Sequence, residues 1–148
     1  MPSVDAKLIA EEDALWHEVL AIMGSFTPAQ AVAPGYFPEG WSAKDALSHI
    51  GTWLAEAGVA LEQLRAGTYI ELRPDQIDEM NERFLDAMRD ASLNDVKAQA
   101  AAARARMLHA WKDVPPEAEA AAAWIRKSGT DHYREHLPRL RAWLDDQP

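Results

Sequence analysis

The stretch Trp41–Leu64, WSAKDALSHIGTWLAEAGVALEQL, predicts a long amphipathic helix and sets the class of the fold. It opens with a capping-box pattern, because Asp45 stands three residues after Ser42, and Gly67 follows its end. Its apolar residues recur every three or four positions; they are Leu47, Ile50, Leu54, Ala57, Leu61 and Leu64. A helix with one apolar face needs other helices to cover that face.

Helical periodicity continues before and after this stretch. The other predicted elements are an N-terminal helix capped by Ser3 or Asp5 and ending at Gly24, a loop over 24–40, a short helix over 75–89, an alanine-rich helix over 92–111 and a last helix over about 118–144. The segment DVPPE, 113–117, separates the last two helices, and we expect Gly129 and Pro138 to kink the last one or to divide it.

These elements together predict an all-α fold. No alternating apolar pattern and no Asn-Gly or Asp-Gly turn occurs in the sequence, so we expect no sheet. We predict a single domain over residues 1–148, built as a four-helix bundle with a long loop after the first helix and a short extra helix before the third.

The composition is that of one folded domain. The chain has 148 residues, of which 48% are apolar and 26% are charged. No apolar run is long enough to cross a bilayer, and the N-terminal MPSVDAKLIAEEDALW lacks the basic and apolar regions of a signal peptide. The absence of cysteine excludes disulfides, thiolate metal sites and a cysteine nucleophile. We therefore expect a cytoplasmic protein with no membrane partner.

The formal net charge of −9 argues against a nucleic-acid partner. An acidic chain repels the phosphate backbone unless its basic residues cluster. The two densest basic stretches, RARMLHAWK at 104–112 and PRLRAW at 138–143, each fit one solvated helix face. We therefore expect a small-molecule substrate and no nucleic-acid partner.

Two of the five histidines, His132 and His136, stand four residues apart in GTDHYREHLP, 129–138, and so share one face of a helix. Neutral imidazoles at this spacing can bind one metal ion, but they can equally be half-exposed residues of an amphipathic helix. The pair lacks the glutamate of the HExxH protease motif. A third candidate is His49, on the flank of the apolar stripe of its helix. The alternative for His49 is a partly buried residue that hydrogen-bonds to a neighbour.

The two remaining histidines are weaker candidates. His17 and His109 each lie beside a tryptophan, with no second histidine at ligand spacing, and we expect them to be packing or surface residues. Trp41 and Trp53 flank the segment that contains His49 and are candidates to wall a pocket.

Two segments resemble the signatures of the DinB-like superfamily of four-helix bundles. GWSAKDALSHIGTW, 40–53, resembles the first signature, and GTDHYREHLPRLRAWL, 129–144, resembles the second, with its H-x-x-x-H on the last helix. The resemblance extends over 13–144. HYREHLPRL, 132–140, and IDEMNERF, 77–84, look most like the branch that includes colibactin self-resistance proteins.

The resemblance implies a divalent metal ion held in a cleft by three histidines, which match His49, His132 and His136 here. Such a set suits zinc, nickel or iron, and three ligands leave coordination positions open, as in catalytic sites. A carboxylate is then needed as a base or an orienting group; the nearby candidates are Asp45, Glu56, Asp131 and Glu135. Each of these is equally a surface acid, and Asp45 is also a capping residue. Ser48 and Ser128 have no recognisable nucleophile pattern around them.

Two classes of function remain open. The first is a metal-dependent enzyme acting on a small molecule, either a hydrolase-like enzyme with a role in stress or toxin resistance, or a transferase or isomerase that uses a thiol such as mycothiol or bacillithiol. The acidic surface and the lack of a basic thiol-binding cluster favour the hydrolase. The second is a non-catalytic bundle that binds a ligand or a partner. In either class, the small side chains of 96–105 would let two copies approach closely in a homodimer.

Overall fold

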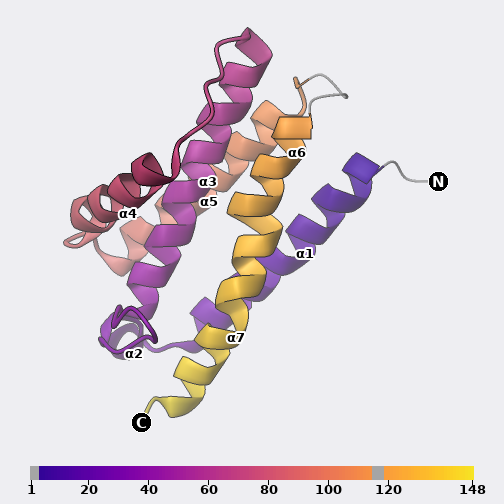
Figure 1. The fold of residues 1–148 in the computed structure, drawn as a ribbon. Helices are drawn as coiled ribbons and strands as arrows, with labels where there is room; N and C mark the ends of the chain where they lie inside the picture. The colour runs from indigo at the N-terminus through magenta and orange to yellow at the C-terminus, as the bar shows by residue number, and fades with distance from the viewer. Residues whose placement is uncertain (1–3, 115–118) are drawn as a thin grey trace.

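The computed structural model of the protein describes residues 4–114 and 119–148, and its regular elements are all helical (Figure 1). They are α1 (Val4–Ser25), α2 (Pro28–Val32), α3 (Ala43–Ala66), α4 (Pro74–Met88), α5 (Leu93–Trp111), α6 (Glu119–Ile125), the π-helical turn η1 (Arg126–Thr130) and α7 (Asp131–Asp146). The predicted all-α class is confirmed. No helix in the described residues has the length and apolar character needed to cross a membrane.

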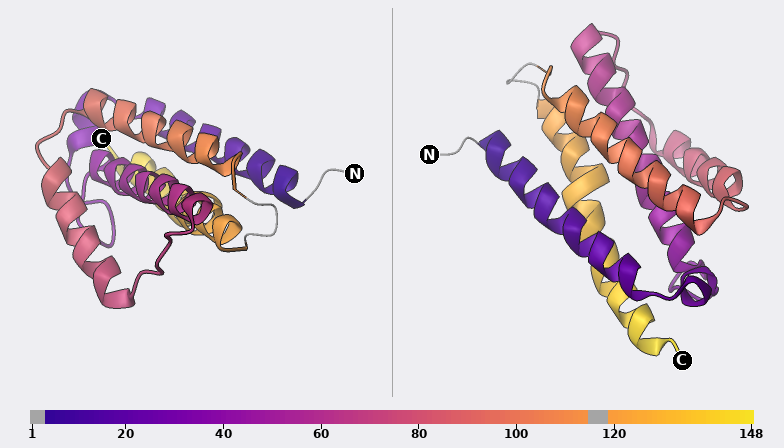
Figure 2. Two further views of the ribbon diagram at one scale, coloured as in Figure 1. Left: turned by 90° about the horizontal axis from the view of Figure 1, so that it is seen from above. Right: turned by 180° about the vertical axis from the view of Figure 1, so that it is seen from behind.

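The bundle consists of four long rods, which are α1, α3, α5 and the continuous run of α6, η1 and α7 (Figures 1 and 2). Helix α3 packs along α5, and α1 packs along α7. The two shorter helices α2 and α4 flank this arrangement, and α4 lies against α3. Helix α4 is the short extra helix that the sequence predicts before the third long helix.

Helix α3 begins and ends where its sequence signals predict. The side chain of Ser42 accepts a hydrogen bond from the backbone N–H of Asp45, and the Asp45 carboxylate accepts one from the backbone of Ser42. At the other end Gly67 adopts the left-handed conformation with φ of 74°, which favours glycine. These two ends fix the register of the helix that carries His49.

The small residues of α5 pack inside the bundle. A Cβ atom added to Gly51 of α3 would lie 3.0 Å from the Cβ of Ala100, so the glycine allows α3 and α5 to approach closely. Ala100 and Ala103 belong to the buried core. Part of the alanine-rich stretch that suggested a dimer surface is therefore used for packing within one chain.

The segment between α1 and α3 contains a helix that the sequence analysis missed. Thr27 caps α2 by accepting a hydrogen bond from the backbone of Gln30, and the Gln30 side chain completes the capping box. Beyond α2, Tyr36 and Trp41 form an isolated antiparallel bridge. The side chain of Tyr36 is fully buried. This segment therefore inserts an aromatic residue into the core instead of looping through solvent.

The last rod contains the irregularity expected near Gly129. In η1 the backbone N–H of Asp131 donates to the carbonyl of Arg126, five residues earlier, and the helix then continues as α7. Pro138 lies inside α7 without ending it. Residues 115–118, where the prediction placed most of the DVPPE break and the start of the last helix, lie outside the described residues, as does Ser3.

Candidate metal centre

The three histidines named from the sequence lie together where α3 faces α7. One ring nitrogen from each of His49, His132 and His136 lies within 4.8 Å of the others. The ring centroid of His132 is 4.8 Å from that of His49 and 4.9 Å from that of His136. The ring planes cross at 79° and 69° in these two pairs, so the rings do not stack. His49 and His132, which lie 83 positions apart in the chain, thus present nitrogens to a common point.

Burial keeps these rings neutral. His132 and His136 are buried, and His49 is half-buried. Loss of solvation lowers the pKa of His49 and of His132 to about 3 and the pKa of His136 to about 4, and in each case a neighbouring imidazole of the cluster lowers it further. The backbone of Ser128 raises the pKa of His132, but by less than burial lowers it. At neutral pH the imidazoles therefore hold free lone pairs, which is the form that binds metal ions.

The hydroxyl of Tyr36 holds one of the rings in place. It lies 2.8 Å from Nδ1 of His136, and both groups are buried. When Nδ1 carries the proton and donates it to the Tyr36 oxygen, Nε2 of His136 keeps its lone pair free. Sequence analysis missed Tyr36, because it lies 100 positions from His136 and no spacing rule connects a loop tyrosine to a distant helix. By contrast, Nδ1 of His132 is buried without a hydrogen-bond partner among the described residues.

Replacing Tyr36 by phenylalanine is expected to weaken metal binding about tenfold, because His136 then loses the partner that fixes its orientation and tautomer. The change is checked by titrating zinc into chelator-treated protein with a competing dye. Tyr69→Phe is the matched control, since Tyr69 accepts a hydrogen bond from Trp124, away from the histidines. Equal affinities for the two variants would mean that the Tyr36 contact does not orient the ring.

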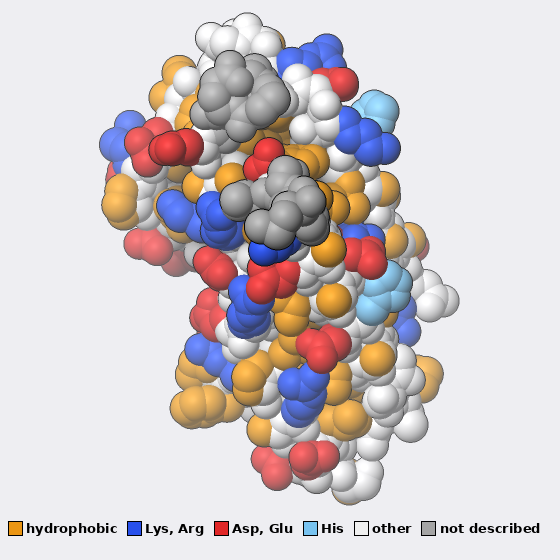
Figure 3. All heavy atoms as spheres, turned by 90° about the vertical axis from the view of Figure 1, so that its right-hand side faces the viewer, with side chains coloured by type: hydrophobic (Ala, Val, Ile, Leu, Met, Phe, Trp, Pro, Cys, Tyr) orange, Lys and Arg blue, Asp and Glu red, His pale blue; other side chains and the backbone are white. Residues whose placement is uncertain are grey.

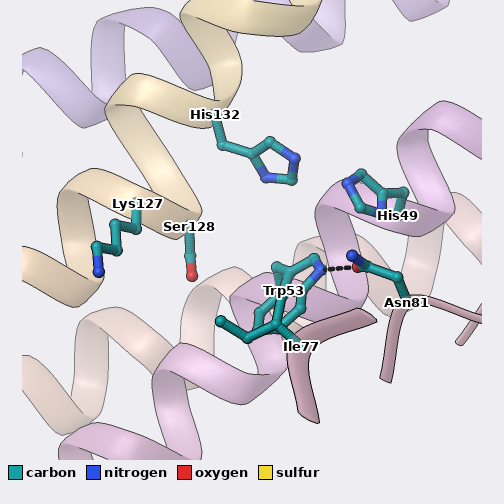
Figure 4. A pocket seen from close by; sticks show the side chains of 7 residues that line it. All are labelled: His49, Trp53, Ile77, Asn81, Lys127, Ser128 and His132. Atoms are coloured by element: carbon teal, nitrogen blue, oxygen red, sulfur yellow. Dashed lines mark hydrogen bonds between the residues drawn. The ribbon is translucent and has the colours of Figure 1, made fainter. Parts of the chain in front are cut away.

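A pocket of about 200 Å³ opens beside two of the histidines (Figure 4). It is lined by His49, Trp53, Ile77, Asn81, Lys127, Ser128 and His132. The predicted role of Trp53 as a wall is confirmed. Trp41 contacts His49 outside this pocket, with ring centroids 5.2 Å apart. Ser128 and Asn81 were not predicted as pocket residues; Asn81 comes from α4, whose position against α3 cannot be read from periodicity.

The four acidic candidates do not line this pocket, and no carboxylate is among its described lining residues. Asp45 is engaged in the cap of α3. Asp131 and Glu135 are exposed and pair with arginines of α7. Glu56 is partly buried, which raises its pKa. The structure therefore supports the alternative roles, a helix cap for Asp45 and surface acids for Asp131 and Glu135.

The histidines that were set aside lie at the surface. His17 and His109 are both exposed. His17 contacts Asp13 on its own helix and takes no part in the histidine cluster. The expectation that these two residues are not ligands of the cluster agrees with their positions.

A second buried polar cluster adjoins the histidine-bearing helix. The fully buried carboxylate of Glu12 accepts hydrogen bonds from Arg104 at 2.7 to 3.1 Å and from the hydroxyl of Tyr133 at 2.8 Å. A Cβ atom at Gly129 would lie 3.3 Å from Cγ of Glu12, so the π-helical turn leaves little room beside the carboxylate. Tyr133 directly follows His132, and the cluster therefore fixes how α7 is rotated relative to α1.

The family profile described as mycothiol maleylpyruvate isomerase N-terminal domain matches residues 13–144. The chain belongs to this family. The match spans both histidine-bearing segments of this chain, 40–53 and 129–144, and the resemblance to the DinB-like superfamily is confirmed. A search of curated proteins finds no significant match.

Two solved structures share the fold of this family member. An uncharacterised protein from Escherichia coli UTI89 superposes with a TM-score of 0.81 at 15% identity, over 99% of this chain and 95% of that one. The colibactin self-resistance protein ClbS, in complex with a dsDNA, superposes with a TM-score of 0.80 at 14% identity, over 100% of this chain and 99% of that one. At these identities the likeness shows the fold alone.

The expectation of no nucleic-acid partner was wrong. It rested on the net charge of −9, yet ClbS, with the same fold, is seen in complex with a dsDNA. Net charge is a poor guide because DNA contacts depend on where basic side chains gather. On the face shown in Figure 3, Lys and Arg side chains lie among the acidic ones, so the surface is not uniformly acidic.

Proposed function

We propose that this member of the mycothiol maleylpyruvate isomerase N-terminal domain family is a divalent-metal-dependent, hydrolase-like enzyme that acts on a small molecule. Its metal ligands would be His49, His132 and His136. The observation that carries the proposal is the convergence of three ring nitrogens within 4.8 Å at the edge of a pocket. Zinc, nickel and iron all accept imidazole ligands, and the donor set does not choose among them.

The side chains present fit such an ion. Three imidazoles with lowered pKa values offer lone pairs at neutral pH. When bound, the ion would lower the pKa of a water molecule or polarise a substrate oxygen. Tyr36 would hold His136 in its ligating orientation, and the indole of Trp41 would shield one side of His49 from solvent. The pocket would bring the substrate to the histidines.

A role in stress or toxin resistance is part of this proposal. It is supported by the fold shared with ClbS, which is described as a colibactin self-resistance protein. A resistance enzyme of this kind would hydrolyse an electrophilic compound. The pocket has no acidic residue among its described lining residues, so it would not repel the electron-rich oxygen atoms that such a compound carries.

The second candidate is a thiol-dependent transferase or isomerase. It is favoured by the family itself, whose description names a mycothiol-dependent isomerase. The two candidates differ in whether a low-molecular-weight thiol is consumed. Turnover that appears only with added mycothiol or bacillithiol would select the thiol enzyme, whereas turnover in thiol-free buffer would select the hydrolase.

The proposal is tested with protein purified without a histidine tag and loaded in turn with zinc, nickel or iron. The substrates are a panel of activated esters, amides and strained-ring electrophiles. We expect metal-dependent, thiol-independent hydrolysis that falls at least about a hundredfold in His49→Ala, since losing a ligand costs more than losing an orienting group. His109→Ala is the matched control, because His109 is exposed and outside the cluster. Hydrolysis that is unchanged in His49→Ala, or unaffected by chelation, would contradict the proposal.

A further inference from the structure

The pocket beside the histidines is fixed on one side by a hydrogen bond between two of its walls. The indole Nε1 of Trp53 donates to Oδ1 of Asn81 at 2.7 Å (Figure 4). An indole N–H can only donate, so the oxygen of the Asn81 carboxamide must face Trp53. The amide nitrogen of Asn81 therefore points away from that bond, and Figure 4 shows it on the side of His49. Asn81 thus presents an N–H donor whose direction is set by a neighbouring residue.

A second donor lines the same pocket. Ser128 is 2% exposed, it lines the pocket with His132, and its hydroxyl makes no hydrogen bond with another of the described residues. Figure 4 shows the hydroxyl directed into the space between Lys127 and Trp53. A hydroxyl that opens to a pocket and lacks a protein partner is free to bond to a ligand or to water. The pocket therefore offers donors from α4 and from η1, and it offers no carboxylate among its described lining residues.

Trp53 and Ile77 form the apolar part of the wall, beside the side chain of Lys127. The indoles of Trp53 and Trp124 lie nearly parallel, with centroids 6.4 Å apart and planes at 27°. The N–H of Trp124 is taken by the hydroxyl of Tyr69 at 2.9 Å, so both indoles have their polar atom engaged within the protein. A second hollow of about 210 Å³ shares Ile77 and Lys127 with the first, and the acidic residue Glu71 is among its other lining residues. Trp53 lines the first hollow and Trp124 lines the second, so the two stacked indoles lie along both.

We propose that this site binds planar aromatic acyl compounds, amides or esters, with the carbonyl oxygen accepting a hydrogen bond from the Asn81 amide nitrogen. The aromatic body lies along Trp53, Ile77 and Trp124. Such a ligand gives the Asn81 donor an acceptor and covers the apolar side chains of the wall, and it brings its acyl carbon beside His49 and His132. These compounds would be the substrate class of the enzyme proposed above. Their turnover rests on that proposed function, whereas their binding does not. Asn81 is a specificity-determining residue in this account.

The test measures binding of 2-naphthamide, and of its ester counterpart methyl 2-naphthoate, to chelator-treated protein, followed by tryptophan fluorescence and by ligand-detected NMR. The absence of added metal ensures that no ion can hold the carbonyl group. 2-Ethylnaphthalene, which has a similar shape but no carbonyl, is the reference ligand. We expect 2-naphthamide to bind more tightly than 2-ethylnaphthalene, because only the amide accepts the Asn81 donor.

The variant Asn81→Asp keeps the acceptor for Trp53 and replaces the donor by a carboxylate oxygen. It is expected to weaken the binding of methyl 2-naphthoate by about tenfold or more, because the ester carbonyl then faces an acceptor and the ester has no N–H to donate to the carboxylate, and to leave 2-ethylnaphthalene binding unchanged. Asn94→Asp, at an exposed position of α5, should bind both ligands as the natural protein does. Trp53→Phe removes the N–H that orients Asn81 and should reduce the preference for the amide while the chain still folds.

Two results would overturn the proposal. One is equal binding of methyl 2-naphthoate by the natural protein and Asn81→Asp; the other is no preference for 2-naphthamide over 2-ethylnaphthalene in the natural protein. Because these measurements are made without metal, loss of the metal-dependent activity in the preceding experiment would leave them unaffected. Amide-selective binding without turnover would support the ligand class and count against the enzyme.

Discussion

Replacing Glu12 by glutamine is expected to lower the free energy of unfolding by about 3 kcal/mol, because it leaves the half-buried Arg104 without its main counter-charge. The carboxylate of Glu12 is fully buried and accepts bonds from Arg104 and from the Tyr133 hydroxyl. Glutamine has almost the same volume but offers one acceptor oxygen in place of two. Asp13 still forms an ion pair with Arg104 in this variant. The loss of stability should therefore stay below the largest values found when one partner of a buried ion pair is removed.

Urea denaturation at neutral pH measures this loss, and the adjacent residue supplies the control. Glu11 lies on the exposed side of α1 and pairs there with Arg134. Glu11→Gln should cost less than about 1 kcal/mol, because exposed ion pairs contribute little. If both variants cost the same, the buried cluster would not be a major source of stability, and its role in fixing the rotation of α7 would lose its support.

Lowering the pH from about 6.5 towards 4 is expected to destabilise the metal-free protein steeply. The ordinary histidine pKa is 6.5, whereas the folded-state pKa is about 3 for His49 and His132 and about 4 for His136. Between these values the unfolded chain binds protons that the folded chain does not. The contribution of the three histidines to the free energy of unfolding is therefore fully present above pH 6.5 and is lost as the pH falls. Each such histidine costs about 1.4 kcal/mol per pH unit within this window.

Chemical denaturation in chelator at pH 7.5, 6 and 5 measures that slope. A His132→Gln variant should show a shallower slope than the natural protein, since one of the three groups no longer titrates. A stability that stays constant from pH 7 to pH 5 would show that the buried imidazoles are solvated in solution, contrary to the packing described above.

The helix-borne part of the site could be predicted from the sequence because its determinants are local. The spacing of His132 and His136 fixes their common helix face, and the cap at Ser42 fixes the register of His49. The family signatures supplied the remaining link, that these two helices face each other. Helix α2 was also predictable, since Thr27 and Gln30 form a capping box with a proline between them, but the surrounding glycines and prolines suggested a plain loop.

The supporting residues could not be predicted because each depends on an encounter between distant segments. Tyr36 reaches His136 only through the path of the chain between α1 and α3. The pairing of Glu12 with Arg104 spans 92 positions and requires α1 and α5 to lie on one side of the bundle. Asn81 enters the pocket only because α4 folds back over α3. Periodicity identifies which face of each helix is apolar, but it does not say which polar residues meet at the boundaries.

The net charge misled because it is a sum over the whole surface. Of the basic side chains, Arg106, Arg134 and Arg139 each pair with a neighbouring carboxylate, so positive and negative groups are interspersed. A total of −9 therefore does not describe any one face of the molecule. What a partner meets depends on local arrangement, which composition does not contain.

The central claim is that three imidazoles from α3 and α7 bind one metal ion. Its most direct test is anomalous X-ray scattering, at the zinc edge, from crystals of tag-free protein grown with one equivalent of zinc. The account predicts a single peak about 2.0–2.1 Å from one nitrogen of each of His49, His132 and His136. A peak that contacts His132 and His136 but not His49, or zinc bound only elsewhere on the protein, would contradict it.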